Sequence, residues 1–129
     1  MSDRFKFALP EGISQLTIYA QDDLVVRGSE RADLSVACDE EPSLQTTDAG
    51  ALLRLADDAE VEVPAQLALL IAQVGDDLNL RSLLGQVRVE AAPDDVSIKH
   101  CGQVTLGRVQ GDLSAQEVQR LEAASVDDD

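Results

Sequence analysis

The sequence predicts an all-β fold, a parallel β-solenoid with two short strands per coil of about 18 residues, capped by a C-terminal α-helix. An acidic corner recurs along the chain at spacings of 17, 18, 19, 18 and 18 residues, which sets the length of the repeat. An alternating apolar triplet follows each of the last three corners, and such alternation is a strand signal. The acidic corners are Asp22-Asp23, Asp39-Glu40, Asp57-Asp58, Asp76-Asp77, Asp94-Asp95 and Asp112.

A second series of corners runs half a period out of phase with the first. The segment GQVRV at residues 85–89 recurs as GQVTL at residues 102–106, with a weaker echo at residues 32–36. In an antiparallel meander, successive turns lie at opposite ends of the sheet and need hairpin chemistry. Two alternating corner types, each repeating once per period, instead favour two strands per coil stacked in register. Leu78 should then stack on Val96 and Leu113, and Val87 on Val104.

The first half of the chain fits the same scheme more loosely. Strands are expected at residues 24–26, 52–55 and 61–63, where apolar and polar positions alternate in part. The run at residues 67–71 is apolar without alternation, so it could be one helical turn or a strand that is buried on both faces.

The two ends of the predicted stack need covers, because open strand edges invite association. Ser114 and Glu117 form a capping-box pattern, and Val118, Leu121 and then Ala124 or Ser125 follow at spacings of three and four. These features predict a single domain with an N-terminal cap at residues 1–15, solenoid coils at 16–114, a capping helix at 115–126 and an acidic tail at 127–129.

Composition and charge restrict the partners of this chain. Two Lys and eight Arg against 25 acidic residues give a formal charge of -15, so electrostatic binding of nucleic acid is not expected. No segment has the length and apolar character of a signal peptide or a membrane span, so membrane insertion is not expected. Cations, a basic or other protein partner, or self-association remain. The expected location is the cytoplasm as the chain stands, and the surface or exterior only if the sequence is truncated.

Cys38 and Cys101 are predicted to be free thiols. They match no metal or redox spacing, and about 3.5 coils at roughly 4.8 Å per coil would separate them by about 17 Å, well beyond disulfide range. His100 adjoins Cys101, but no partner for a thiol nucleophile and no second soft metal ligand is evident. The arginines Arg54, Arg81, Arg88 and Arg108 are expected on outward faces, where they interrupt the negative field.

Stacked carboxylates about 4.8 Å apart repel each other by roughly 1 kcal/mol even in water, and a hard cation such as calcium would relieve that repulsion. The simpler interpretation is that Asp is a good turn residue whose solvated charge keeps the edges soluble. No metal ligand is therefore assigned. The candidate ligands, if the corners bind a cation, are Asp58, Asp76, Asp77, Asp94, Asp95 and Asp112.

The corners and short strands resemble the bacterial putative-adhesin family of repetitive β-solenoid domains of unknown function. The resemblance spans about Leu16 to Ala115 and is clearest in VGDDL at 74–78, GQVRV at 85–89 and VQGDL at 109–113. A more distant resemblance is to bactofilins, cytoskeletal β-solenoids that polymerise end to end. The adhesin resemblance implies an exported protein, whereas the chain begins without a signal-peptide pattern.

The predicted function is a non-enzymatic scaffold or protein-interaction module without a cofactor. No phosphate-binding loop, nucleophile elbow or zinc-protease motif occurs in the sequence, and no catalytic residue is assigned. Two alternatives stay open, a subunit of a polymerising bactofilin-like assembly and a calcium-binding surface module.

Overall fold

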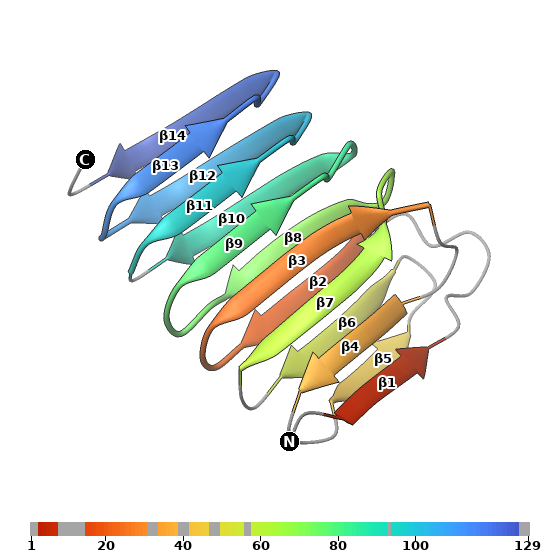
Figure 1. Cartoon of the computed structure of the whole chain (residues 1–129). Helices are drawn as coiled ribbons and strands as arrows, with labels where there is room; N and C mark the ends of the chain where they lie inside the picture. The colour runs from red at the N-terminus through yellow and green to blue at the C-terminus, as the bar shows by residue number, and fades with distance from the viewer. Residues whose placement is uncertain are drawn as a thin grey trace.

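The computed structural model describes residues 3–7, 15–30, 34–38, 42–46, 50–55, 58–92 and 94–126. Over these ranges the chain forms two sheets that lie face to face (Figure 1). Sheet A contains, in spatial order, β1 (Asp3–Phe7), β4 (Leu34–Cys38), β7 (Ala59–Pro64), β3 (Leu24–Ser29), β9 (Leu78–Arg81), β11 (Val96–Lys99) and β13 (Leu113–Gln116). Sheet B contains β14 (Arg120–Val126), β12 (Gln103–Val109), β10 (Gln86–Ala92), β8 (Ala68–Gln73), β2 (Gln15–Ala20), β6 (Ala51–Leu55) and β5 (Ser43–Thr46).

From β8 onward the chain alternates between the two sheets, and each strand from β10 onward pairs in parallel with the strand one period earlier in the sequence. We use "coil" for one strand of sheet B together with the strand of sheet A that follows it. Leu78 pairs with Val96 and Val96 with Leu113, while Val87 pairs with Val104. These registers confirm the stacking that the 18-residue repeat predicts for this part of the chain.

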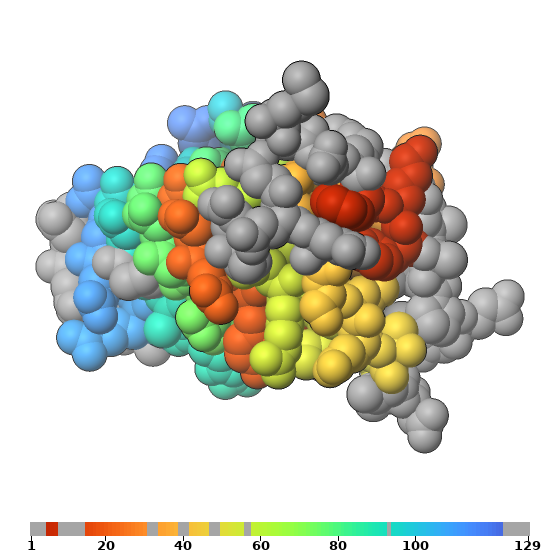
Figure 2. Space-filling view, turned by 90° about the horizontal axis from the view of Figure 1, so that it is seen from below, coloured from red at the N-terminus to blue at the C-terminus, as the bar shows by residue number. Residues whose placement is uncertain are grey.

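The first coil of the chain lies in the middle of the stack. β2 pairs with both β6 and β8, and β3 pairs with both β7 and β9, so the coil β2–β3 separates two coils that are consecutive in sequence. In Figure 2 the orange band of residues near 20–30 accordingly lies between green and yellow-green bands. Stacking in strict sequence order is therefore wrong for the first half of the chain.

The end of the stack beyond β6 and β7 is built from antiparallel strands. β4 pairs with β7, β1 with β4, and β5 with β6, all antiparallel. Phe5 and Phe7 of β1 pack against the core, while Lys6 between them is exposed. β1 thus contributes the edge strand of sheet A. Residues 8–14, the rest of the predicted N-terminal cap, lie outside the described residues.

The core between the sheets consists of columns of aliphatic side chains from alternate positions of the strands. Burial of these side chains is the main favourable term for folding, since each contributes about 1.5–3 kcal/mol. Neighbouring coils approach so closely that some positions, within strands as well as at corners, admit no side chain. A Cβ atom on Gly107 would lie 2.0 Å from the carbonyl oxygen of Glu90, and one on Gly75 would lie 2.0 Å from that of Gln21.

The predicted C-terminal helix at residues 115–126 is wrong. Residues 113–116 form β13 and residues 120–126 form β14, which pairs in parallel with β12. Glu117 has φ 54°, as the corner residues Ser82 and His100 have φ 56° and 54°, so it occupies a corner rather than the first turn of a helix. Val118 and Leu121 continue the columns of the preceding coil. A spacing of three residues suits a corner followed by a strand as well as it suits a helix.

Other expectations have the following outcomes. The apolar run at 67–71 leads into a strand, β8, and the strands expected at 24–26, 52–55 and 61–63 lie within β3, β6 and β7. Both cysteines are free and buried, with Cys38 in β4 and Cys101 just after β11, four strands away in sheet A. The four arginines expected outside are exposed. Asp39, Glu40 and Asp57 lie outside the described residues.

We predict that Val104→Asp destabilises the fold far more than Thr105→Asp does. Both substitutions add one carboxylate to β12, but Val104 is 2% exposed in the aliphatic core and Thr105 is exposed. An unpaired charge in the core should lower the free energy of unfolding by about 3–5 kcal/mol, whereas Thr105→Asp should change it by less than about 1 kcal/mol. Urea titration followed by circular dichroism measures both. Equal stability of the two variants would contradict the assigned core.

Candidate functional site

The acidic corners gather on one side of the stack, where each chain segment leaves sheet B and enters sheet A. In each described coil an aspartate directly precedes the first residue of the sheet A strand. Following the stack rather than the sequence, these residues are Asp58, Asp23, Asp77, Asp95 and Asp112. We call this row the aspartate ladder.

Four of the five ladder carboxylates, all but that of Asp112, are seen to accept a hydrogen bond from the backbone of the next coil. The N–H of Asp23 donates to Oδ1 of Asp58 at 3.2 Å, and the N–H of Asp77 donates to Oδ1 of Asp23 at 3.0 Å. The N–H of Asp95 donates to Oδ1 of Asp77 at 3.3 Å, and the N–H of Asp112 donates to Oδ1 of Asp95 at 2.9 Å. The side chains thus continue the inter-coil hydrogen bonding through the corner.

The backbone carbonyl of a ladder residue binds in the opposite direction along the stack. The carbonyl of Asp77 accepts from the N–H of Leu24 at 3.0 Å, and the carbonyl of Asp95 accepts from the N–H of Leu78 at 3.0 Å. Asp77 and Asp95 therefore each hold both neighbouring coils, one through the carbonyl and one through the carboxylate. Aspartate suits this position because its short side chain can reach a nearby backbone N–H.

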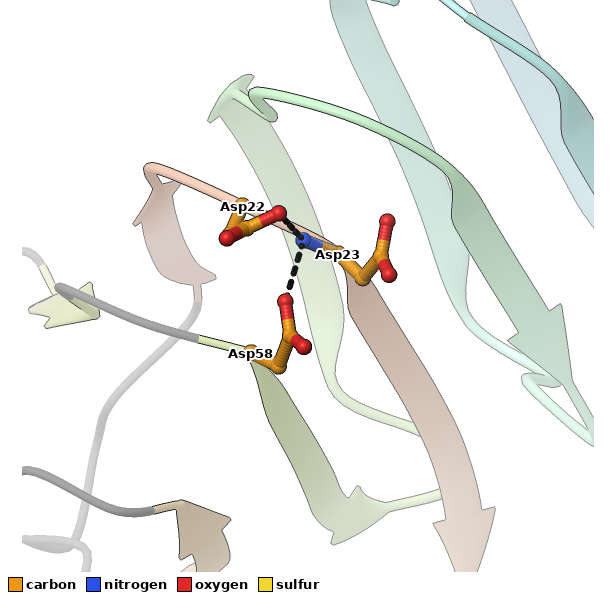
Figure 3. A group of neighbouring side chains, drawn as sticks. All are labelled: Asp22, Asp23 and Asp58. Carbon is orange, nitrogen blue, oxygen red and sulfur yellow. Dashed lines mark hydrogen bonds between the residues drawn. The ribbon is translucent and has the colours of Figure 1, made fainter.

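The first aspartate of a pair binds within its own corner. Oδ1 of Asp22 accepts from the N–H of Asp23 at 3.0 Å, and Oδ1 of Asp94 accepts from the N–H of Asp95 at 3.0 Å. In Figure 3 the carboxylates of Asp22 and Asp58 converge on the same N–H of Asp23. The ladder residue and its neighbour thus fix the corner together.

The corners bring carboxylates close enough to share a ligand. Within the described residues three groups have oxygens that all lie within 4.8 Å of one another. They are Asp22, Asp23 and Asp58; Asp23, Asp76 and Asp77; and Asp77, Asp94 and Asp95. Such oxygen-rich groups match the ligand preference of calcium, but the hydrogen bonds of the ladder explain most of these aspartates without an ion.

Hydrogen bonding, burial and neighbouring charges together raise the pKa of Asp58, Asp76 and Asp77. A hydrogen bond with Asp94, then burial and the charges of Asp23, Asp77 and Asp94, raise the pKa of Asp76 from 3.8 to about 6. Burial, followed by the charge of Asp94, raises the pKa of Asp77. For Asp58 the hydrogen bond from Asp23 lowers the pKa, but burial and the charges of Asp22 and Asp23 outweigh it, so the pKa is raised.

Shallow hollows border the ladder on the outer face of sheet A. One, of about 200 Å³, is lined by Asp77, Asp95 and Asp112 together with polar side chains of β9, β11 and β13. Another, of about 330 Å³, lies over β7 and β3 beside Asp58 and Asp23. Carboxylates line one side of each hollow, which gives both hollows a negative potential.

The sequence identified most of the ladder but not all of it. The candidates Asp58, Asp76, Asp77, Asp94, Asp95 and Asp112 lie in these corners, and their role as cation ligands stays a prediction. Asp22 and Asp23 were not among the candidates, although they belong to two of the three carboxylate groups. Their place in the acidic repeat was the available signal.

The His100-Cys101 pair lies at the opposite corner. Nδ1 of His100 contacts Oε2 of Glu117 in the next coil, while the Cys101 thiol is 2% exposed and donates to the carbonyl of Lys99 at 3.5 Å. Burial raises the pKa of the Cys101 thiol. A buried thiol with a raised pKa is a poor nucleophile at neutral pH. This geometry supports a structural role for Cys101.

A second surface feature is the end of the stack formed by β13 and β14. These strands have a neighbour on one side within the described residues, in sheets A and B respectively. The core columns end here with Leu113, Val118 and Leu121, which are partly buried, and with Ala115, which is exposed. We call this surface the open end.

Comparisons with known proteins find resemblance at the level of structure. A crystal structure of a putative cell adhesion protein from Clostridium sporogenes has a TM-score of 0.43 and 10% identity, with 100% of both chains covered. A putative adhesin from Bacteroides fragilis has a TM-score of 0.37 and 9% identity, covering 98% of this chain and 95% of that one. A putative adhesin from Parabacteroides distasonis has a TM-score of 0.36 and 9% identity, covering 100% and 97%.

No family model and no curated protein matches the sequence. Within the described part of the chain, no helix has the length and apolar character needed to cross a bilayer.

We predict that Asp77→Ala lowers stability and that Asp77→Asn does not. Alanine removes one of the two acceptors of the Asp95 N–H, the one that joins neighbouring coils, while Oδ1 of Asp94 remains, so the cost should be about 0.5–1 kcal/mol. Asparagine keeps an oxygen at this position and removes a charge from a crowded row. Chemical denaturation of both variants and the parent chain measures the difference. A loss of the same size in both variants would mean that the charge, and not the hydrogen bond, holds this corner.

The raised pKa of Asp76 predicts that stability declines as the pH rises. The folded-state pKa of about 6 exceeds the ordinary value of 3.8, so the folded protein binds the proton more tightly than the unfolded chain does. The resulting stabilisation is complete below pH 3.8 and is lost as the pH rises through about 6. Urea denaturation at fixed ionic strength across this range should show the decline, and Asp76→Asn should flatten it. An unchanged slope in that variant would assign the effect to other groups.

Proposed function

We propose that this chain is a non-enzymatic β-solenoid module that associates with protein through the open end. The observation that carries the proposal is the difference between the two ends of the stack. At one end the sheets finish in antiparallel strands, with β1 and β5 outermost. At the other end both sheets finish in strands of the repeat itself, β13 and β14.

The far end has features that discourage pairing. Lys6 lies exposed on β1, and a lysine on an edge strand disfavours the approach of another strand. Phe5 and Phe7 of the same strand pack against the core and close it on that side. The exposed Lys6 therefore disfavours edge pairing at β1.

The open end presents both backbone and apolar surface. Val96, Cys101 and Val104, one coil inside, are 1–2% exposed, whereas the equivalent Leu113 and Val118 are partly exposed. Covering such side chains contributes about 25 cal/mol per Å² of apolar area. An added strand would also pair with the N–H and C=O groups of an edge, which is a common mode of protein recognition.

The aspartate ladder supports a role without catalysis. Oδ1 of Asp58, Asp23, Asp77 and Asp95 accepts a backbone hydrogen bond along the stack, which supports a structural role for these carboxylates. The buried thiol of Cys101 supports the same conclusion. Function through surface contact then requires strand edges and apolar side chains that the rest of the described chain does not cover, and the open end has both.

Both alternatives stay predictions. A bactofilin-like polymer would require the open end of one copy to meet the β1 and β5 end of the next, where Lys6 is exposed. Calcium binding would use the three carboxylate groups of the ladder. Nothing in the described residues beyond the carboxylates themselves points to an ion.

We predict that Ala115→Lys abolishes partner binding and that Gln110→Lys leaves it intact. Both variants add one positive charge at an exposed site, but Ala115 lies at the open end and Gln110 at a corner after β12. Proteins captured from the source cell by the parent chain are identified by mass spectrometry. The purified partner is then titrated calorimetrically with all three chains. We expect the affinity to fall at least about tenfold for Ala115→Lys, as expected when a charge interrupts an interface core.

Equal binding by both variants would place the interaction on another surface. Absence of any binding protein, a second copy of this chain included, would overturn the proposed function.

A further inference from the structure

We propose that the partner at the open end is a second copy of this chain, joined through antiparallel pairing of the two β14 strands about a twofold axis at Leu121. This inference rests on the proposed function and names its partner. The charged and apolar side chains of the edge strand β14 follow one another in an order that suits antiparallel pairing with an identical strand.

Arg120 and Glu122 lie on the same outer face of β14, one residue on either side of Leu121. Arg120 Nη2 is 2.8 Å from Glu122 Oε1, and both side chains are mostly exposed. Leu121 points the other way, into the column that continues Val104. The strand thus carries a positive and a negative charge placed symmetrically about one apolar residue.

Antiparallel pairing with Leu121 opposite Leu121 converts this order into complementarity. Arg120 of one copy then faces Glu122 of the other, and the twofold axis repeats the contact. Opposite charges directly across an antiparallel pair are favourable, and like charges are unfavourable. Leu121 of each copy meets its equivalent and extends the apolar column across the interface.

The same axis also pairs the second edge. β13 and β14 end their sheets on the same side of the molecule and run in opposite directions (Figure 1). A twofold axis perpendicular to the sheets therefore makes β13 antiparallel to β13 while it makes β14 antiparallel to β14. The outward residues of β13, Ser114 and Gln116, are uncharged, so nothing on that strand opposes the pairing by charge.

The aspartate ladders do not oppose this arrangement. The ladder runs along one side of the stack and reaches the open end at Asp112, before β13 begins. Rotation about the twofold axis reverses the strand direction, so the two ladders end on opposite sides of the interface. The repulsion expected between two chains of formal charge -15 is thereby kept away from the contact itself.

A contact of this kind closes on itself. Each copy uses the same surface, so the assembly stops at two chains and leaves the β1 and β5 ends outside. A discrete dimer is thus expected in place of a filament. In this register residues 120–122 of the two β14 strands face one another, and residues 123–126 extend past the partner's strand.

Charge-swap variants test the pairing. Arg120→Glu leaves two acidic residues on β14, and Glu122→Arg leaves two basic ones, so each variant alone should dimerise at least about tenfold more weakly than the parent chain. An equimolar mixture of the two variants should restore the dimer as a mixed pair, because every acidic residue again faces a basic one. Both variants lack the Arg120–Glu122 contact within the chain, so restoration in the mixture can come only from contact between chains.

Sedimentation velocity across a concentration series measures the dissociation constants. The matched control is Arg88→Glu, which breaks the Arg88–Glu90 pair of β10, 3.7 Å apart, in the interior of sheet B. This variant should dimerise like the parent chain. Thermal melts show whether all variants keep the fold.

The outcomes separate this inference from the proposed function. A monomeric parent chain, or a mixture no tighter than its components, would overturn the dimer. If Ala115→Lys still abolished binding of a different protein, the open end would keep its function with another partner. Growth of mass beyond two chains would overturn the closed dimer and favour the polymer.

Discussion

Every coil of this protein depends on hydrogen bonding that does not stop where the strands stop. Asp23, Asp77 and Asp95 each bind the coil on one side through the carbonyl and the coil on the other side through the carboxylate, as Asp77 binds Leu24 and Asp95. Without such a group the corner N–H of the next coil would lose its acceptor in the neighbouring coil. The ladder therefore fixes the register in which the aliphatic columns meet.

The uniformity of this corner allows coils to combine out of sequence order. Asp23 accepts from the N–H of Asp77, 54 residues away, with the same geometry that joins consecutive coils. Its carbonyl accepts from Ala59 on the other side. Because each coil presents the same acceptor and the same kind of column, the coil β2–β3 fits between two others, and the chain can place an early coil in the middle of the stack.

This uniformity also decides how much the sequence could predict. The 18-residue period and the alternation of apolar positions predict the pairing of β9, β11 and β13. Here Leu78, Val96 and Leu113 belong to consecutive coils that also stack consecutively. The period and the alternation could not predict the place of β2, since Leu16 pairs as well with Leu69 as with Ala51. They also misassigned Val118 and Leu121, whose spacing fits both a helix and a corner followed by a strand. The acidic repeat located the ladder residues. The carboxylates next to Asp22 and Asp23 follow from the place of the coil β2–β3 between two other coils, which the repeat did not predict.

The close approach of carboxylates in the ladder carries an electrostatic cost. Carboxylates held this close repel one another, and the raised pKa of Asp76, caused first by its hydrogen bond with Asp94, is the measure of that crowding. The backbone hydrogen bonds offset the repulsion only while the coils stay stacked, so the carboxylates serve the fold first. Each coil is completed by the next, and β13 and β14 are the described strands of the repeat that lack one. The apolar columns and strand edges that the described coils leave uncovered at β13 and β14 are therefore the surface to which we assign partner binding.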